Sequence, residues 1–454
     1  MASASLVRMG VRGFTTASSV TRDRLALALA PALTPDGTVA SPSFFHGFAT
    51  EPQVLARGLL SLADITATRY FKYTPTTQRD PVLTAHGDRL RAEVFSACNS
   101  VYARLDLLGS GLDGGEVAHG TTNVDIGMAT RQALASVGRG ELFHLDVGRH
   151  GLTVATPATA ATERPVEMPN RWIPALGNVA ELHRGLARAF TLDRAAARAL
   201  LTSIPATTAT GSAGWLTPTA AGFRIAPRRT DRAVHVNGIH RLSGLKRLLP
   251  HVTGLTVYGP ADGEPGATAF EVELQHARLL LGITKEPWRG FSGEGSLLSA
   301  LASPEVTEHA ALVSALLAFE PVIDVERLRL ESGLTTAQVE SGLAVLAASG
   351  RVGWDIRARA HFHRELLDDP ERVTRDNPRV SAARRLVAQR LVERGTEPGE
   401  WLVHSGTRTE PATYSVRGAD GDARCTCTWQ LTGGGDRGPC KHVLAAQIMM
   451  KEIR

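Results

Sequence analysis

The chain has 454 residues, of which 43% are hydrophobic and 21% are charged, and its formal net charge is +5. This length exceeds one ordinary hydrophobic core, so we expect roughly two to four domains. No apolar run reaches the ~18 residues that a membrane-spanning helix requires, and the mean hydropathy is -0.06, so an integral membrane protein of the helical type is excluded.

Arginine dominates the basic residues, with 45 Arg against 5 Lys. Together with abundant Ala, Gly and Leu, this bias is typical of a high-GC bacterial genome and favours the cytoplasm. Residues 1–24 contain Ser, Thr and Arg and no acidic residue before Asp23, a composition faintly like an organelle transit peptide. Because the arginine excess runs through the whole chain, we interpret these residues as a flexible N-terminus.

The N-terminal part, residues 25–202, is expected to mix helices with strands. Apolar spacing over residues 42–107 predicts mostly helices. On this reading Cys98 shares an apolar helical stripe with Val94 and Val101, where a buried and inert thiol is the usual explanation.

Further along the same region, residues 148–151 form a turn with glycine at both ends, which predicts a hairpin. Helices are then expected over residues 179–190 and 193–201, with Thr191 as the cap of the second. Residues 203–221 are rich in Thr, Ala, Gly and Pro, which indicates a linker and a domain boundary. Alternating patterns over residues 223–283 predict a small sheet-containing domain beyond it.

Residues 305–367 predict a helix, a short helix, a turn, a third helix and two strands. Thr335 can cap the start of the third helix and Gly350 its end. This order resembles winged helix-turn-helix domains, whose third helix usually enters the major groove of DNA. Residues 305–365, however, hold nine acidic residues and six arginines, a net of −3. We therefore expect protein docking or a purely structural role at least as much as DNA contact. Arg357 and Arg359 on the hairpin are the cations of this segment that could contact DNA.

Two other segments concentrate positive charge. Residues 224–251 hold seven cations against one aspartate, and residues 372–394 hold seven arginines against two acidic residues. Such runs could follow a phosphate backbone, although a solvated face or pairing with the acidic segment above explains them equally well. The candidate nucleic-acid contacts are Arg384, Arg385, Arg437 and Lys441.

The strongest motif lies near the C-terminus, where Cys425-x-Cys427 is followed after twelve residues by Cys440-x-His442. Three thiolates and one imidazole complete a tetrahedral zinc shell. Because no coordination position stays open, the site is predicted to be structural rather than catalytic. The alternatives are a cluster of reduced cysteines that bind nothing and a Cys425–Cys427 disulfide, which would be strained across one residue.

The flanks of the motif fit this interpretation. Two strands are predicted before Cys425, a loop between the two ligand pairs, and a helix after Pro439. Cys440 and His442 would then lie in the first turn of that helix, where the helix dipole favours a thiolate.

This arrangement resembles the SWIM zinc finger, a strand-strand-helix module with the pattern Cys-x-Cys, a variable gap and Cys-x-His. The resemblance covers residues 399–454 and implies one structural Zn2+ and binding to DNA or to proteins. Length and layout also loosely resemble actinobacterial SWIM-containing proteins associated with MoxR-type ATPases and von Willebrand A-domain proteins, which this second resemblance implies as partners.

Catalytic motifs are missing from the sequence: it has no Walker-type glycine loop, no nucleophile elbow and no HExxH. The glycine-rich residues 109–115 are interpreted as a loop, and Asp125 has no partner carboxylate at a readable spacing. We expect a non-enzymatic zinc protein that binds nucleic acid or serves as an adaptor. The alternative is an enzyme with an unrecognised active site in residues 25–290.

The predicted fold class is α+β multidomain, with an N-terminal α/β region and a C-terminal strand-strand-helix zinc finger. The expected parts are a flexible N-terminus (1–24), a mixed domain (25–202), a basic sheet-containing domain (223–300), a winged-helix-like segment (305–367), a basic helix (370–398) and the zinc finger (399–454).

Overall fold

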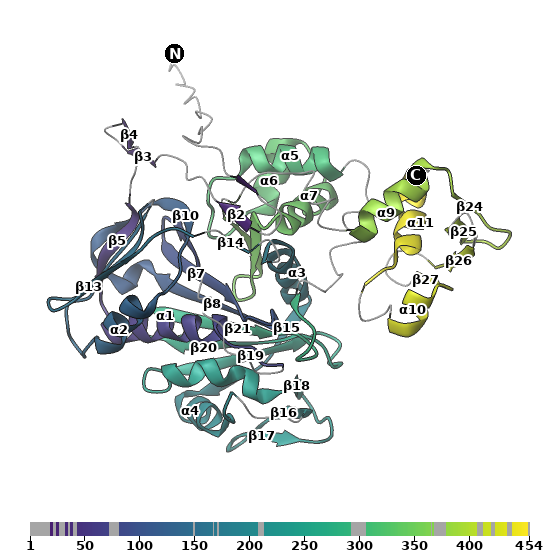
Figure 1. Ribbon diagram of the computed structural model, residues 1–454. Coiled ribbons are helices and arrows are strands. Elements are labelled where there is room, and N and C mark those ends of the chain that lie inside the picture. Colours follow the sequence, from purple (N-terminus) through teal and green to yellow (C-terminus); the bar gives the residue numbers. More distant parts are fainter. Residues whose placement is uncertain are drawn as a thin grey trace, which may run out of the picture.

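The computed structural model shows a body built on sheets and a smaller C-terminal group of elements, yellow-green and yellow in Figure 1. Four short strands near the N-terminus are described by their backbone alone: β1 (Ser19–Val20), β2 (Arg24–Ala26), β3 (Ala32–Thr34) and β4 (Gly37–Val39). Beyond them, apart from a few isolated positions, the structure describes residues 43–71, 81–148, 150–166, 172–207, 213–291, 306–364, 378–405, 412–418, 423–433 and 438–452.

The body is centred on an antiparallel eight-stranded sheet with the order β10-β6-β7-β8-β21-β20-β19-β15. Buried side chains of its strands form a large part of the first apolar core of the chain. The strands are β6 (Val82–His86), β7 (Arg89–Phe95), β8 (Val101–Leu108), β10 (His119–Asn123), β15 (Leu186–Asp193), β19 (Gly254–Pro260), β20 (Thr268–Leu274) and β21 (Ala277–Ile283).

The helical prediction for residues 82–107 is wrong, because these residues form β6, β7 and β8. Leu90 and Val94 alternate with Arg91 and Glu93 along β7, the period of a strand with two different faces. Cys98 therefore lies in the turn between β7 and β8 and not on a helical stripe. The helix prediction holds only for α1 (Pro52–Thr66), which packs on β7 and β8.

A five-stranded sheet lies beside α1 and has the order β13-β12-β11-β5-β9. Its β11 and β12 are joined by the predicted turn at residues 148–151, with Gly148 opposite Gly151, so that hairpin is confirmed. The elements are β5 (Ser43–Ala49), η1 (Gly109–Gly111), β9 (Leu112–Val117), α2 (Met128–Ser136), β11 (His144–Gly148), β12 (Gly151–Ala155) and β13 (Ala160–Glu163).

The next segment departs from the predicted helices over residues 179–190. Helix α3 (Trp172–Arg184) ends early, and Leu186 begins strand β15. Helix α4 (Arg194–Ser203) is capped by Asp193, whose carboxylate accepts a 2.9 Å hydrogen bond from the Ala196 amide. The Thr191 cap is therefore wrong: Asp193 is also a favoured N-cap residue, and it lies directly before the helix.

Residues 203–221, the predicted boundary, include strand β16 of a small third sheet. Strands from both sides of this segment lie in the eight-stranded sheet and share its core, so the segment joins two parts of one body. The remaining elements here are β14 (Met168–Pro169), β16 (Ala213–Thr219), β17 (Gly222–Ala226), β18 (Val234–Asn237) and η2 (Ile239–Leu248).

Residues 306–363 contain the predicted helices and hairpin in the predicted order: α5 (Val306–Leu316), α6 (Val325–Ser332), α7 (Thr336–Ala348), β22 (Val352–Asp355) and β23 (Ala360–His363). The Thr335 cap is confirmed as a capping box with Gln338, and Gly350 has a positive φ of 80°. Residues 342–350 are all buried, and α7 packs against α5 and α3. Most of the third helix is therefore covered within this fold.

The β22–β23 hairpin docks on the sheet through buried charges that we call the charge cluster: Arg91, Arg104, Asp106, Arg278 and Asp355. The Asp355 carboxylate lies 2.7 Å from the Arg91 guanidinium and 2.5 Å from that of Arg278. Burial alone would raise the pKa of Asp355, but Arg104, Arg91 and Arg278 outweigh it and hold that pKa well below its ordinary value. The hairpin is thus held to the sheet by ion pairs that water does not screen.

The C-terminal group contains a four-stranded antiparallel sheet, β24-β25-β26-β27, against which α11 packs, with α9 on α11. Its buried residues belong to a second apolar cluster that also includes α5, α7 and β22. The elements are α9 (Pro378–Ala388), β24 (Val392–Arg394), β25 (Glu400–His404), β26 (Thr413–Arg417), β27 (Arg424–Cys425), α10 (Thr428–Gly433) and α11 (Lys441–Glu452).

Among the residues that the structure describes, no helix combines the length and the apolarity that crossing a bilayer would demand.

Candidate metal centre

Each predicted metal ligand is held by a different piece of local structure. Cys425 ends strand β27, where it pairs with Val416 of β26. Cys427 directly precedes α10, and its carbonyl accepts hydrogen bonds from the amides of Gln430 and Leu431. Residues 428–433 are therefore helical, although the sequence predicted a loop between the two ligand pairs.

Cys440 and His442 come from the start of α11, as predicted. The Cys440 carbonyl accepts from the Leu444 amide, and its sulfur lies 3.4 Å from the Val443 nitrogen. Cys440 thus stands where an N-cap side chain would, with its Sγ at the positive end of the helix dipole. This position favours the thiolate form that a metal requires.

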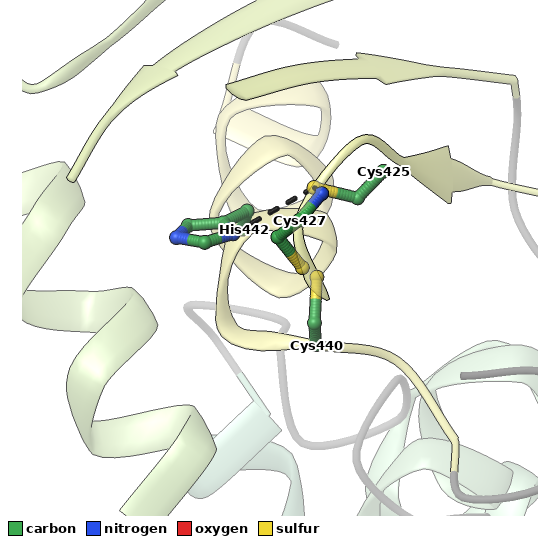
Figure 2. Close-up of side chains that lie close together, drawn as sticks. All are labelled: Cys425, Cys427, Cys440 and His442. Carbon is green, nitrogen blue, oxygen red and sulfur yellow. Dashed lines mark hydrogen bonds between the residues drawn. The ribbon is translucent and has the colours of Figure 1, made fainter. Parts of the chain in front are cut away.

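The four side chains converge in a buried group, as Figure 2 shows. Their ligand atoms all lie within 4.8 Å of one another, and each residue is at most 5% exposed. Two sulfurs bound tetrahedrally at ~2.3 Å from one zinc ion lie roughly 3.8 Å apart. Small shifts of these side chains would therefore close all four around one ion.

The imidazole of His442 is oriented by its neighbours. Its Nδ1 lies 3.6 Å from the Cys425 sulfur, whereas its Nε2 points away from the three sulfurs in Figure 2. The Tyr414 ring stacks on the imidazole, with centroids 4.3 Å apart and planes 18° from parallel. The geometry therefore makes Nδ1 the ligand atom, and Tyr414 keeps the ring in place.

The electrostatics of the group fit a divalent cation. Hydrogen bonding from the Cys425 thiol, with help from His442 and the Val443 amide, lowers the pKa of Cys440 to about 4. Donating that hydrogen bond, together with burial, raises the pKa of Cys425, and burial raises that of Cys427. Burial and mutual repulsion oppose ionisation of all three thiols together, and a bound Zn2+ would supply the charge that lets the three sulfurs ionise.

The residues present therefore fit one structural zinc ion with a Cys3His shell. All four donors come from the protein and all are buried, so no position is left for water or substrate.

The candidate nucleic-acid contacts are distributed around this centre. Arg385 is exposed on α9, whereas Arg384 on the same helix and Lys441 at the start of α11 are half-buried. Arg437 lies outside the described residues, as do residues 370–377 of the predicted basic helix.

Some of the other basic residues singled out in the sequence make contacts within the body. Arg241 is fully buried and donates to the carbonyls of Asn237, Ser100 and Thr284. Arg357 on the hairpin donates to Glu271 and Glu273. Four arginines of the 224–251 run do remain exposed, Arg224, Arg228, Arg229 and Arg232, and the last two lie within 4 Å of a carboxylate.

Sequence reasoning missed two aromatic residues at the centre. Tyr414 stacks on a ligand, and Trp429, 39% exposed, lies in the turn of helix that follows Cys427. The guanidinium of Arg379 on α9 lies 5.0 Å from the centre of the Trp429 ring. The proximity of Trp429 to Cys427 in the sequence was the available signal for this residue.

The comparison with protein families agrees with the metal site. Residues 414–449 match the SWIM zinc finger family. Among solved structures, the chain resembles Proliferating Cellular Nuclear Antigen from Entamoeba histolytica, with 11% identity and a TM-score of 0.36 over 54% of this chain and 99% of that one. It also resembles the PCNA2-PCNA3 complex from Sulfolobus tokodaii, with 8% identity and a TM-score of 0.38 over 53% and 98%. No curated protein matches the chain.

Proposed function

We propose that this chain is a non-enzymatic, zinc-dependent binding protein whose C-terminal group, helix α9 together with the finger, binds nucleic acid. The observation that carries the proposal is where the charge lies. Residues 378–454, which contain α9 and the finger, hold 12 Lys and Arg against 8 Asp and Glu, a net of +4, whereas the whole chain holds 50 against 45, a net of +5. The remaining 377 residues therefore contribute only +1. A cation-rich surface is the ordinary electrostatic feature of a protein that follows a phosphate backbone.

The metal supports a binding role rather than catalysis. A shell of four buried protein ligands offers no open coordination position, so the ion would fix the shape of the finger. In the body, the carboxylates with lowered pKa values, Asp106 and Asp355, are held by arginines at the sheet–hairpin interface. Such perturbed groups serve an ion-pair network instead of an acid–base pair.

The helical segment at residues 306–363 supports an adaptor role for the rest of the chain. The C-terminal half of its third helix, residues 342–348, is buried, the helix packs against α3 and α5, and its hairpin faces the sheet. A winged-helix protein that reads DNA needs that helix exposed. We therefore assign to this segment the structural or protein-docking role, with a MoxR-type ATPase or a von Willebrand A-domain protein as the partner class that the loose resemblance names.

The test is oligonucleotide binding by the zinc-loaded full chain at several salt concentrations. Affinity should fall steeply with salt, because each neutralised phosphate contributes about −0.7 to −0.9 to the slope of log K against log salt. The double variant Arg384→Ala, Arg385→Ala should bind more weakly and show a shallower slope. Affinity that did not change with salt would refute nucleic-acid binding, and turnover of nucleotides or phosphoesters by pure protein would refute the non-enzymatic part.

A further inference from the structure

A hollow of about 590 Å³ lies in the body, where β18 approaches the end of β19 (Figure 1). We call it the arginine hollow, because Arg188, Arg229 and Arg232 all line it. Its volume is within the range of sites that hold small molecules. Its wall is made of three short segments, residues 187–189, 229–235 and 259–264.

Two glycines leave the room that this arrangement needs. A Cβ at Gly259 would lie 3.0 and 3.1 Å from the methyl carbons of Val234, so the glycine lets β18 lie close to β19. Gly263 has a positive φ of 70°, and a Cβ there would collide with the guanidinium of Arg229. Arg229 can therefore cross this turn and donate a 3.3 Å hydrogen bond to the Asp262 carbonyl. The backbone of the wall thus fixes one cation at the hollow.

The carboxylates of the hollow are weak competitors for an anionic ligand. Glu264 lies 2.9 Å from Arg229 with its side chain 66% exposed, and Asp231 lies 3.7 Å from Arg232 with its side chain 95% exposed. Exposed pairs of this kind contribute little free energy. The Asp262 carboxylate accepts from the Glu264 amide within its own turn. A ligand with two negative charges can therefore replace these single charges, whereas a ligand with one charge gains little.

Arg188 adds a cation that has no competing carboxylate. It is exposed on β15, next to a register shift in the pairing with β19, and it makes no ion pair or side-chain hydrogen bond with any described residue. The planar fork of a guanidinium matches the oxygens of a phosphate group. His235 lines the same hollow, and within the described part of the chain its Nδ1 is buried without a hydrogen-bond partner. Ala189 and Val234 give the wall an apolar part that an uncharged portion of a ligand can contact.

We propose that the arginine hollow binds a small phosphate monoester, with its phosphate group among the guanidinium groups of Arg188, Arg229 and Arg232. A monoester carries nearly two negative charges near neutral pH and three oxygens that accept hydrogen bonds, so it can bridge more than one arginine. A phosphodiester carries one negative charge and is disfavoured by the same reasoning. The inference is independent of the zinc finger and adds a second class of ligand, held by the body.

The experiment is isothermal titration calorimetry of the zinc-loaded full chain with adenosine, cyclic AMP, AMP and inorganic phosphate. The first three carry no, one and about two negative charges on nearly the same uncharged body. AMP and inorganic phosphate should bind, adenosine should not, and cyclic AMP should bind roughly tenfold more weakly than AMP because it offers fewer charged hydrogen bonds. An oligothymidylate without terminal phosphates represents the diester source and should not displace AMP.

Four variants locate the site. Arg188→Gln should weaken AMP binding roughly tenfold, the usual loss for a charge-assisted hydrogen bond, whereas Arg194→Gln, at an exposed position of α4 outside the hollow, should not. Glu264→Gln should tighten AMP binding roughly two- to fivefold, because it removes the carboxylate that competes for Arg229. Glu326→Gln is its matched control, since it breaks an exposed ion pair on α6, and it should leave the affinity unchanged.

Each variant should unfold thermally at the midpoint of wild type, so that lost binding is separated from a lost fold. The inference is wrong if neither AMP nor inorganic phosphate binds at millimolar concentration, or if adenosine binds as tightly as AMP. It is also wrong if AMP binds but Arg188→Gln and Glu264→Gln behave like wild type, because the ligand then lies elsewhere.

Displacement of AMP by the oligothymidylate would place the hollow on a nucleic-acid path and refute the small-molecule class. The proposed function can fail separately. The double variant Arg384→Ala, Arg385→Ala should weaken oligonucleotide binding and leave AMP binding as it is in wild type.

Discussion

Two regions of this molecule bury charge, and they neutralise it in different ways. In the charge cluster of the body, arginines from the sheet meet aspartates from the sheet and the hairpin, so the chain supplies both signs itself. In the finger, three cysteines and one histidine share a small buried space, and full ionisation of the thiols needs a cation from outside. The body is therefore expected to stay folded in any buffer near neutral pH, whereas the finger is expected to fold only when it binds a metal ion.

The largest expected effect is the removal of zinc. Structural zinc binding is worth roughly 10–16 kcal/mol in isolated fingers, so a strong chelator or Cys440→Ser should unfold α11 and β25–β26 and leave the eight-stranded sheet intact. Hydrogen exchange read by mass spectrometry would show lost protection in the finger alone. Cys98→Ser is the control that keeps zinc. If α11 stayed protected from hydrogen exchange in the presence of chelator, the finger would not need metal to fold, and the contrast with the body would be wrong.

The second effect tests the body. Asp355→Ala removes one carboxylate from beside three buried arginines, and an unpaired buried charge typically costs about 3–5 kcal/mol. The free energy of unfolding, measured by denaturant titration, should fall by that amount while zinc content stays unchanged. Glu264→Ala breaks the exposed pair with Arg229 and should cost little. If Asp355→Ala lowered the free energy of unfolding as little as Glu264→Ala does, the charge cluster would contribute no more stability than an exposed ion pair.

Acidification should weaken the body through its buried histidines. Burial lowers the pKa of His183 and His363 to about 3 and that of His361 to about 4. The unfolded chain binds protons at these rings below about pH 6.5 and the folded chain does not, so stability is full above that pH and declines as pH falls toward the folded values. Each ring contributes up to ~1.4 kcal/mol per pH unit.

The measurement is the denaturation midpoint of the sheet in the presence of zinc, followed from neutral to mildly acidic pH. His363→Gln should flatten the slope, since one titrating ring is gone. An unchanged midpoint across this range would show that the rings are protonated in the folded state or are reached by water.

The smallest effect concerns α7, which depends on neither metal nor buried ion pairs. Thr335 caps this helix through the Gln338 amide, and replacing such a cap by alanine costs about 1 kcal/mol. Thr335→Ala should raise hydrogen exchange in the first turn of α7 only. Thr336→Ala, an exposed neighbour inside the helix, should leave exchange unchanged, and equal effects from both would argue against capping as the cause.

The finger was predictable because its chemistry is local in sequence. Two short ligand pairs, the residue types at each position and Pro439 before a helical pattern define the centre without knowledge of the rest of the chain. Its neighbours were not predictable in the same way, because the contact of Arg379 with Trp429 joins residues 50 positions apart.

The sheet was harder to predict for a physical reason. Strands β7 and β8 are buried on both faces, and one face carries charges that are paired across the sheet, such as Arg91 opposite Asp106. A charged residue in a sequence usually indicates solvent, and the apolar spacing over residues 42–107 therefore predicted helices, with Val94 and Val101 on one apolar stripe. The opposite charges of the two segments could have corrected this prediction. Arg91 and Glu93 precede a short turn, and Arg104 and Asp106 follow it with charges of the opposite sign at the paired positions.

The order in which the ribosome delivers these strands has a consequence for folding. Strand β8 pairs with β21, so residues 101–108 await partners at residues 277–283, and Asp355 follows still later. Until then the nascent sheet has an open edge and arginines that lack their full set of carboxylates. Non-local pairing of this kind folds slowly, and an unpaired edge is prone to intermolecular association. Expression at low temperature or with a chaperone that shields strand edges should therefore raise the soluble yield of this chain.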